Sequence, residues 1–413
     1  MQLLLNDIRQ IVTVAGNGAP SKRGSEMRKL GVIENGFILV EDSTIAQLGA
    51  GSFAGDLSED ATVLDCTGFV ALPGFVDSHT HLLFAGSRAN EFAMRAEGKS
   101  YQEIAAAGGG ILSTVAATRA ASKKELKKLA RHHLDAMMQL GTTTCEIKSG
   151  YGLNEESERK MLECINELAD EHLMEIVPTF LAAHAVPPEF AGNPDAYVEL
   201  ICERMLPYVA QRKLATFCDA FCETNYFSVE QTRRIFHKAR SLGLDLRIHA
   251  DQLTQIGASR LAAEMRAASI DHLECVDEAG IAAIKASGSV ATLLPGVSFF
   301  LNYGYPPARA LIDAGIPLAI ATNFNPGSCM SYSMPLMMTI ASTNAGMSVE
   351  EVIAAATLNG AASLKRSDRL GSLEPGKQAD IILYDIPDYR HLVYHFGVNH
   401  VSKIIKRGTL LEF

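Results

Sequence analysis

Apolar segments of strand length alternate with charged, amphipathic segments of helical length through the central part of the chain. Short runs rich in β-branched and aromatic residues predict strands, and longer segments that are apolar on one side predict surface helices. The eight predicted strands are 70–76, 142–147, 175–182, 216–222, 245–248, 269–271, 289–294 and 317–321. The helices predicted between them include 123–140, 155–172, 194–211, 229–242, 255–267 and 277–287. Such alternation is typical of parallel βα units, and eight units fit a closed (β/α)8 TIM-like barrel in the α/β class.

The two ends of the chain have a different pattern. Short apolar runs broken by turn residues predict strands near 3–5, 11–14, 36–41 and 44–48, and the C-terminal segment adds 380–384 and 402–406. We expect the two ends to form one small β-sandwich domain, made of residues 1–66 and 367–413. Residues 67–366 would then form the barrel.

Composition agrees with a large folded protein. A chain of 413 residues exceeds the usual size of a single core, which suits a barrel with an accessory domain. Its hydrophobic fraction of 47% and charged fraction of 20% are those of a globular protein. The net charge of −10 disfavours nucleic acid and anionic membranes as partners, because either would require a basic face.

The location of the protein is predicted from features of the same kind. No stretch approaches the ~20 apolar residues of a membrane helix, and the first residues lack the basic and apolar regions of a secretion signal. The eight cysteines form no CxxC pair and are expected to be free thiols. We therefore expect a cytoplasmic protein.

Two histidines close the first predicted barrel strand. Residues i and i+2 of an extended strand face the same side, so the rings of His79 and His81 can reach one metal ion. A chance pair of histidines on one strand is the alternative. Polar residues also follow later strands, on the face where barrel enzymes keep their active sites, and this favours the metal site. These residues are Tyr151, His184, His249, His272 and Asn323.

The other histidines are given no role. Those inside helical patterns lie near Lys and Arg and are predicted to be solvated; they are His132, His133, His172 and His237. Three more, His391, His395 and His400, lie beyond the barrel.

Several separated motifs resemble a known family. Segments 73–81 (PGFVDSHTH), 357–362 (TLNGAA) and 371–380 (GSLEPGKQAD) resemble the amidohydrolase superfamily. Within it, the chain resembles the imidazolonepropionase family at 108–111 (GGGI), 148–152 (KSGYG), 183–188 (AHAVPP), 249–252 (HADQ) and 325–327 (NPG). The resemblance covers nearly the whole chain.

The resemblance implies a metal and a substrate pocket. It implies one Zn or Fe ion bound by His79, His81 and His249, with Asn323 completing the site. The residues expected to line the substrate pocket are Arg88, Tyr151, His184, Gln252, Asn325, Gly327 and Ser328. Tyr101 is a weaker candidate on the segment that carries the triple glycine. The family also suggests a homodimer.

The family implies hydrolysis of the ring amide of 4-imidazolone-5-propanoate to N-formimidoyl-L-glutamate, a step of histidine degradation. His272 would sit beside the attacking water and transfer protons, and His184 would orient or polarise the ring carbonyl. The small-molecule substrate carries a carboxylate, which suits the guanidinium fork of Arg88. A surface pair between Arg88 and Glu91 is the alternative.

One position departs from the family. The chain has Asn323 where the family has Asp after the eighth strand. An amide oxygen can approach a metal, but it brings no negative charge and cannot accept a proton as a carboxylate does. Asn323 is therefore a predicted ligand and catalytic position with weakened chemistry. Two alternatives stay open: another cyclic amidohydrolase or nucleobase deaminase of the superfamily, and a catalytically impaired protein that only binds ligand.

Overall fold

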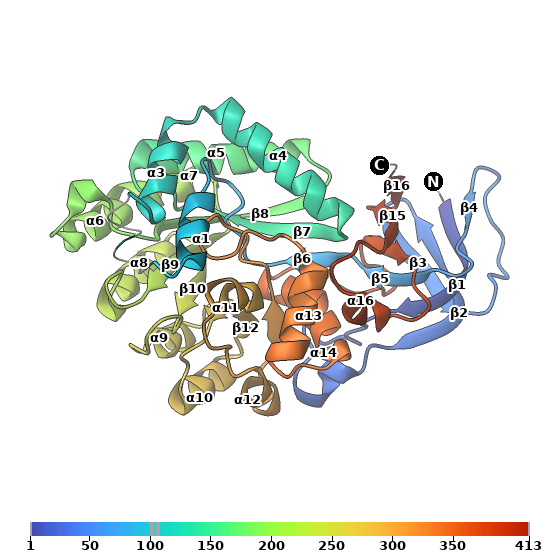
Figure 1. Ribbon diagram of the computed structural model, residues 1–413. Coiled ribbons are helices and arrows are strands. Elements are labelled where there is room, and N and C mark those ends of the chain that lie inside the picture. Colours follow the sequence, from blue (N-terminus) through green and yellow to red (C-terminus); the bar gives the residue numbers. More distant parts are fainter. Residues whose placement is uncertain (1, 100–102, 104–107, 412–413) are drawn as a thin grey trace.

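The barrel is the larger part of the computed structural model, which describes residues 2–99, 103 and 108–411 (Figure 1). Its strands are β6 (Phe75–Asp77), β7 (Thr142–Lys148), β8 (Glu175–Ala183), β9 (Phe217–Cys222), β10 (Asp245–Ala250), β11 (Ser269–His272), β12 (Val290–Leu293) and β13 (Leu318–Ile320). Each strand pairs in parallel with the next along the chain. A parallel bridge between Thr80 and Phe324 joins the segments that follow β6 and β13. The bridge closes the ring, which confirms the predicted (β/α)8 barrel.

Helices surround the barrel (Figure 1). They are α1 (Ala89–Ala96), α3 (Ile111–Ala120), α4 (Lys123–Gln139), α5 (Glu155–Glu171), α6 (Pro194–Leu200), α7 (Leu206–Gln211), α8 (Val229–Ser241), α9 (Ala258–Glu264), α10 (Glu278–Ser287), α11 (Pro295–Leu301), α12 (Ala308–Asp313), α13 (Met334–Asn344), α14 (Val349–Ala356), α15 (Leu358–Ser363) and α16 (His391–Tyr394), with short helical turns η1 (Gly24–Arg28) and η2 (Pro188–Phe190). The helix predicted over 194–211 is interrupted by a π-helical turn, η3 (Ile201–Met205). Pro207 follows that turn and lacks the N–H that a regular α-helix would require.

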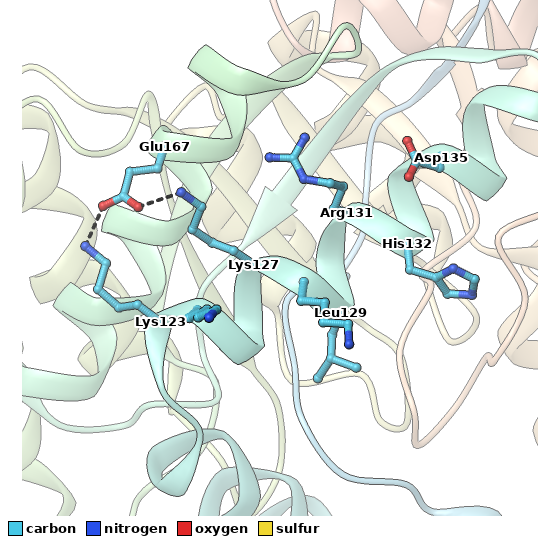
Figure 2. A pocket seen from close by; sticks show the side chains of 9 residues that line it. Lys123, Lys127, Leu129, Arg131, His132, Asp135 and Glu167 are labelled. Carbon is cyan, nitrogen blue, oxygen red and sulfur yellow. Dashed lines mark hydrogen bonds and ion pairs between the residues drawn. The ribbon is translucent and has the colours of Figure 1, made fainter.

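A ladder of ion pairs joins α4 to α5 on the outside of the barrel. Lysines at every fourth position of α4 face α5, and Lys123 and Lys127 both pair with Glu167, at 2.5 and 2.9 Å (Figure 2). Arg131 continues the ladder to Glu171 at 2.6 Å. Three of the cations that line the hollow above α4, of about 730 Å³, therefore already have carboxylate partners: Lys123, Lys127 and Arg131.

Both chain ends contribute to one mixed sheet beside the barrel, which confirms the predicted composite domain (Figure 1). Its strands are β1 (Gln2–Val12), β2 (Val32–Glu41), β3 (Thr44–Ala50), β4 (Thr62–Asp65), β5 (Val70–Pro73), β14 (Ile381–Tyr384), β15 (Val401–Lys406) and β16 (Thr409–Leu411). The order is β16-β15-β14-β5-β1-β2-β3, with β4 also on β1. The runs predicted at 3–5 and 11–14 form one strand, β1, whose register shifts between Leu5 and Ile8.

The single strand predicted over 70–76 is wrong. β5 pairs with β1 and β14 in the mixed sheet, whereas β6 opens the barrel. Gly74 lies between them, where a Cβ atom would overlap the side chain of Thr143. An unbroken apolar run cannot indicate which sheet each half joins. The domain division at 66/67 and 366/367 remains a proposal, and the pairing of β5 favours an N-terminal boundary at Gly74.

Two of the histidines expected to be solvated are not. The ring of His133 packs against Phe84 and Phe324, with centroid distances of 5.5 and 4.9 Å. The side chain of His172 is 6% exposed and lies 3.1 Å from an oxygen of Asp135. His133 is on α4 and His172 follows the last residue of α5, and nearby charged residues in the sequence did not indicate that either side chain is largely buried.

Two other expectations concern the chain as a whole. All eight cysteines are free, as predicted, and seven of them are buried. Within residues 2–99, 103 and 108–411, no helix is both long enough and apolar enough to cross a membrane.

A buried cation connects the mixed sheet to the barrel. Lys406, on β15, donates from Nζ to the carbonyl oxygen of Thr143 on β7 at 3.0 Å. The same Nζ lies 2.7 Å from Oδ2 of Asp380, and both side chains are almost fully buried. Burial lowers the pKa of Lys406, and the nearby Asp380 carboxylate opposes that shift by favouring the charged ammonium.

Replacing Lys406 by Met should destabilise the protein, because it leaves Asp380 buried without its cation. Loss of one partner of a buried pair costs about 3–5 kcal/mol. We expect a lower melting temperature for Lys406→Met in calorimetry, and partial recovery when Asp380→Asn is added. Lys403→Met on the same strand is the matched control, and equal melting temperatures for the two lysine variants would contradict the prediction.

Candidate metal centre

Three histidines converge at the C-terminal face of the barrel. His79 and His81 follow β6, and His249 lies near the end of β10. One ring nitrogen of each lies within 4.8 Å of the other two, and all three side chains are buried. The Nε2 atoms of His81 and His249 are 3.3 Å apart.

The chemistry of the three rings fits a metal ion. Within the described part of the chain, His79 Nε2 and His81 Nδ1 are buried without a hydrogen-bond partner. Burial is the largest cause that lowers the pKa of all three histidines, so the rings are neutral at physiological pH. Neutral imidazoles with free lone pairs are ligands for Zn and Fe. The site therefore supports a metal ion without identifying it.

Carboxylates hold two of the rings in position. Nδ1 of His79 lies 2.7 Å from Oδ2 of Asp271 on β11, and Nδ1 of His249 lies 3.1 Å from Oδ1 of Asp219 on β9. A carboxylate at one ring nitrogen keeps the proton there and leaves the other nitrogen as a ligand.

Buried cations pair with these carboxylates. Arg247 lies 3.0 Å from Asp271, and Lys148 lies 2.8 Å from Asp219 and 2.8 Å from Glu146, all with fully buried side chains. Burial raises the pKa of Asp219, but His249 and Lys148 outweigh that effect and hold it well below its usual range. This network was not predicted from the sequence. Charged residues inside otherwise apolar strands were the available signal, since a charge is buried only when it is paired.

Asn323 is joined to the histidines through its backbone. Its N–H donates to the carbonyl oxygen of His79 at 3.0 Å, across the closure of the barrel. Its side-chain Nδ2 donates to Oγ of Ser328 at 3.2 Å. Oδ1 is buried and, among the described residues, has no hydrogen-bond partner. A buried, unused acceptor therefore belongs to the residue whose backbone is bonded to His79.

His184 and Tyr151 cover one side of the site. The ring of His184 stacks on His81 with a centroid distance of 4.9 Å, and Tyr151 lies 5.4 Å from His184. Nδ1 of His184 is 3.0 Å from the carbonyl oxygen of Gly150. Burial lowers the pKa of His184 to about 3 and raises that of the Tyr151 phenol, so both groups are neutral near pH 7.

His272 lies on another side of the histidine group. Its ring centroid is 5.7 Å from that of His79 and 5.2 Å from that of His249. His272 and Leu273 both have positive φ, at 83° and 70°, which is rare for residues with side chains. Nδ1 of His272 lies 3.4 Å from Oε1 of Glu274.

The loop after β13 meets the loop after β6. Oδ1 of Asn325 accepts from the N–H groups of Gly327 and Ser328, at 2.7 and 2.9 Å, which makes a tight turn. A Cβ atom at Gly327 would overlap the guanidinium of Arg88, so the absence of a side chain there lets Arg88 lie against the turn. Arg88 also pairs with Glu91 at 2.7 Å, as in the alternative interpretation.

The structure says less about the remaining two candidates, Gln252 and Tyr101. Gln252 follows β10 directly after Asp251, and its carbonyl oxygen accepts from Sγ of Cys275 at 3.6 Å. Tyr101 lies outside the described residues. The structure therefore brings most of the predicted site residues to one face of the barrel, while their roles stay predictions.

Comparisons with known proteins agree with this geometry. The Amidohydrolase family model matches residues 70–411. Imidazolonepropionase of Alkaliphilus metalliredigens is 44% identical, covering 100% of this chain and 98% of that protein, and the enzyme of Caldanaerobacter subterraneus is 46% identical, covering 98% and 96%.

Solved structures agree on the fold. A triazine hydrolase from Arthrobacter aurescens has a TM-score of 0.76 at 18% identity, covering 99% of this chain and 94% of its own. An adenosine deaminase from Xanthomonas campestris with bound zinc has a TM-score of 0.72 at 18% identity, covering 99% and 92%. By its family match and its full-length relatives, this chain belongs to the amidohydrolase family and, within it, to the imidazolonepropionases.

Proposed function

We propose that the protein hydrolyses the ring amide of 4-imidazolone-5-propanoate to N-formimidoyl-L-glutamate, a step of histidine degradation. The observation that carries this proposal is a buried group of three neutral histidines with Arg88 held nearby against the 325–327 turn. Full-length relatives named imidazolonepropionase support the same reaction over nucleobase deamination.

The proposed metal is a single Zn or Fe ion held by His79, His81 and His249, with Oδ1 of Asn323 as a fourth, uncharged ligand. When bound, such an ion lowers the pKa of water and so supplies a nucleophile at neutral pH. The carboxylates Asp271 and Asp219 keep His79 and His249 in the tautomer that ligation needs.

His184 would orient the substrate ring. The low pKa of His184 keeps its ring neutral, and with the proton on Nδ1 that N–H donates a hydrogen bond to the carbonyl oxygen of Gly150. Nε2 then carries a lone pair and can accept an N–H of the imidazolone ring. This tautomer favours the orienting role predicted from the sequence over the polarising role, because a lone pair cannot donate to a carbonyl.

His272 would transfer the proton. Glu274 lies beside its Nδ1, which leaves Nε2 for the reacting groups. Asn323 cannot share this task, since an amide does not accept a proton near neutral pH. Arg88 and the neutral phenol of Tyr151 would bind the propionate of the substrate, Arg88 by its guanidinium nitrogens and Tyr151 by donating its O–H.

A second candidate function rests on Asn323 alone. A site that lacks the family's carboxylate could bind the substrate and turn it over poorly, which would make the protein a ligand-binding one. The intact histidine group and its carboxylate supports favour the enzyme. A homodimer and a cytoplasmic location stay predictions.

Removing the metal should abolish activity. We expect metal analysis to find about one Zn or Fe per chain, and chelation to stop turnover of imidazolone propionate until either ion is restored. His249→Ala should contain little metal, because one of three histidine ligands is lost. His237→Ala, on the outer helix α8, is the control. Full activity after complete metal loss would exclude the proposed mechanism.

Asn323→Asp should raise activity. A carboxylate adds a negative charge at the ion and a second proton acceptor, and general bases contribute roughly 10²- to 10⁴-fold. The Ser328 hydroxyl, which now accepts from Asn323 Nδ2, can rotate to donate to the new carboxylate. We expect higher kcat and tighter metal binding in steady-state and metal-competition assays. No activity in either form would favour the ligand-binding function.

Arg88→Gln should weaken substrate binding far more than it lowers kcat, since it removes the cation that meets the propionate. A charge-assisted bond is worth about 1.5–3 kcal/mol, so we expect KM to rise roughly tenfold or more. Arg95→Gln on the same helix region is the control. Assays with guanine, cytosine and hydantoins test the alternative, and preferred turnover of any of these would contradict the proposed substrate.

A further inference from the structure

We infer that Glu158, a residue outside the histidine group, fixes the position of both Tyr151 and His184 and is therefore a positioning residue for substrate binding. The inference rests on the proposed function, because it concerns how that substrate pocket is held. It is drawn from the hydrogen bonds of one buried carboxylate.

Glu158 lies in the first turn of α5, and its side chain points back into the loop that precedes the helix. Oε1 accepts from the N–H of Gly152 at 2.8 Å, of Leu153 at 2.9 Å and of Gly150 at 3.1 Å. Oε2 lies 3.2 Å from the same N–H of Gly150. The residue is 1% exposed, so water cannot replace these bonds.

The loop adopts a conformation that needs such support. Gly150 has φ of 105°, and a Cβ atom there would lie 2.8 Å from the carbonyl oxygen of Leu181. Leu153 has φ of 53°, in the left-handed region that side chains rarely adopt. Three N–H groups therefore point inward toward one carboxylate, an arrangement that the backbone alone would not hold.

The clamped loop carries both sides of the proposed pocket. Tyr151 lies between two of the clamped N–H groups, so Glu158 determines where the phenol stands. The carbonyl oxygen of Gly150 accepts from Nδ1 of His184, so the same clamp sets the tautomer and ring direction of His184. Glu158 thus acts on two residues of the proposed pocket through the backbone of the loop that precedes α5.

The loop is also tied to the neighbouring strand. The N–H of Leu181 on β8 donates to Oγ of Ser149 at 3.0 Å, and the Ser149 hydroxyl in turn hydrogen-bonds to Glu158. Because His184 directly follows β8, one connected set of hydrogen bonds spans the loop, the helix and the strand. A shift of the carboxylate would move the pocket as a unit.

The test compares Glu158→Ala, Glu158→Gln and a control, Glu156→Gln, which changes an exposed carboxylate on the same helix. For Glu158→Ala we expect KM for imidazolone propionate to rise roughly tenfold or more, with bound metal unchanged, because three buried N–H groups lose their acceptor. Glu158→Gln keeps one oxygen acceptor but places an NH₂ toward Gly150, so its KM should be intermediate. Glu156→Gln should match the wild type.

A double-mutant cycle separates positioning from general stability. If Glu158 acts through Tyr151, the effect of Glu158→Gln on KM should shrink in a Tyr151→Phe background. Additive effects, or a KM within twofold of wild type for Glu158→Gln, would overturn the inference. Where Glu158→Ala does not fold, the Gln variant carries the test.

Hydrogen exchange tests the clamp without any substrate. The amides of Gly150, Gly152 and Leu153 should exchange faster in Glu158→Gln, while the rest of α5 keeps its protection. Unchanged exchange would overturn the inference even in an active enzyme. Absence of turnover by the wild-type protein would instead overturn the proposed function and leave the exchange result to decide the clamp.

Discussion

The pairing of buried charges inside the barrel is the constraint on which the site depends. Arg247 and Lys148 lie under the histidines, where each alone would be prohibitively costly to bury. They are paired with Asp271, Asp219 and Glu146, so three carboxylates face two cations. Two of these carboxylates, Asp271 and Asp219, also orient the rings of His79 and His249, so the charge pairs and the positions of the histidines depend on the same side chains.

Much of the fold could be predicted from the sequence, because parallel barrel strands are short apolar runs and their helices are amphipathic. The pattern failed where one apolar run serves two sheets: β5 and β6 are continuous in sequence and separated only at Gly74. The spacing of apolar residues indicates which side of a segment is buried, but not which element covers that side. The packing of His133 against Phe84 was missed for the same reason.

Less of the candidate site than of the fold could be predicted from the sequence. Residues at strand ends are visible in the sequence, so His79 and His81 could be grouped with His184, His249 and His272, and the family resemblance then indicated which of them bind the metal. Their supports were not predictable in this way, because Asp271 lies 192 residues from the ring that it holds. Glu158 was missed for another reason: its partners are backbone N–H groups, which nearly every residue has. A carboxylate that binds backbone leaves no complementary residue in the sequence to indicate its role.

The composite sheet has a consequence for how the chain folds during synthesis. β5 is placed between β1, near the start of the chain, and β14, which follows the whole barrel. While the ribosome is still making the barrel, β5 presents an unpaired edge of the kind that recruits foreign strands. The nascent protein therefore stays incomplete until its final residues emerge, and a chain truncated near its C-terminus would be prone to aggregation even with every residue of the metal site present.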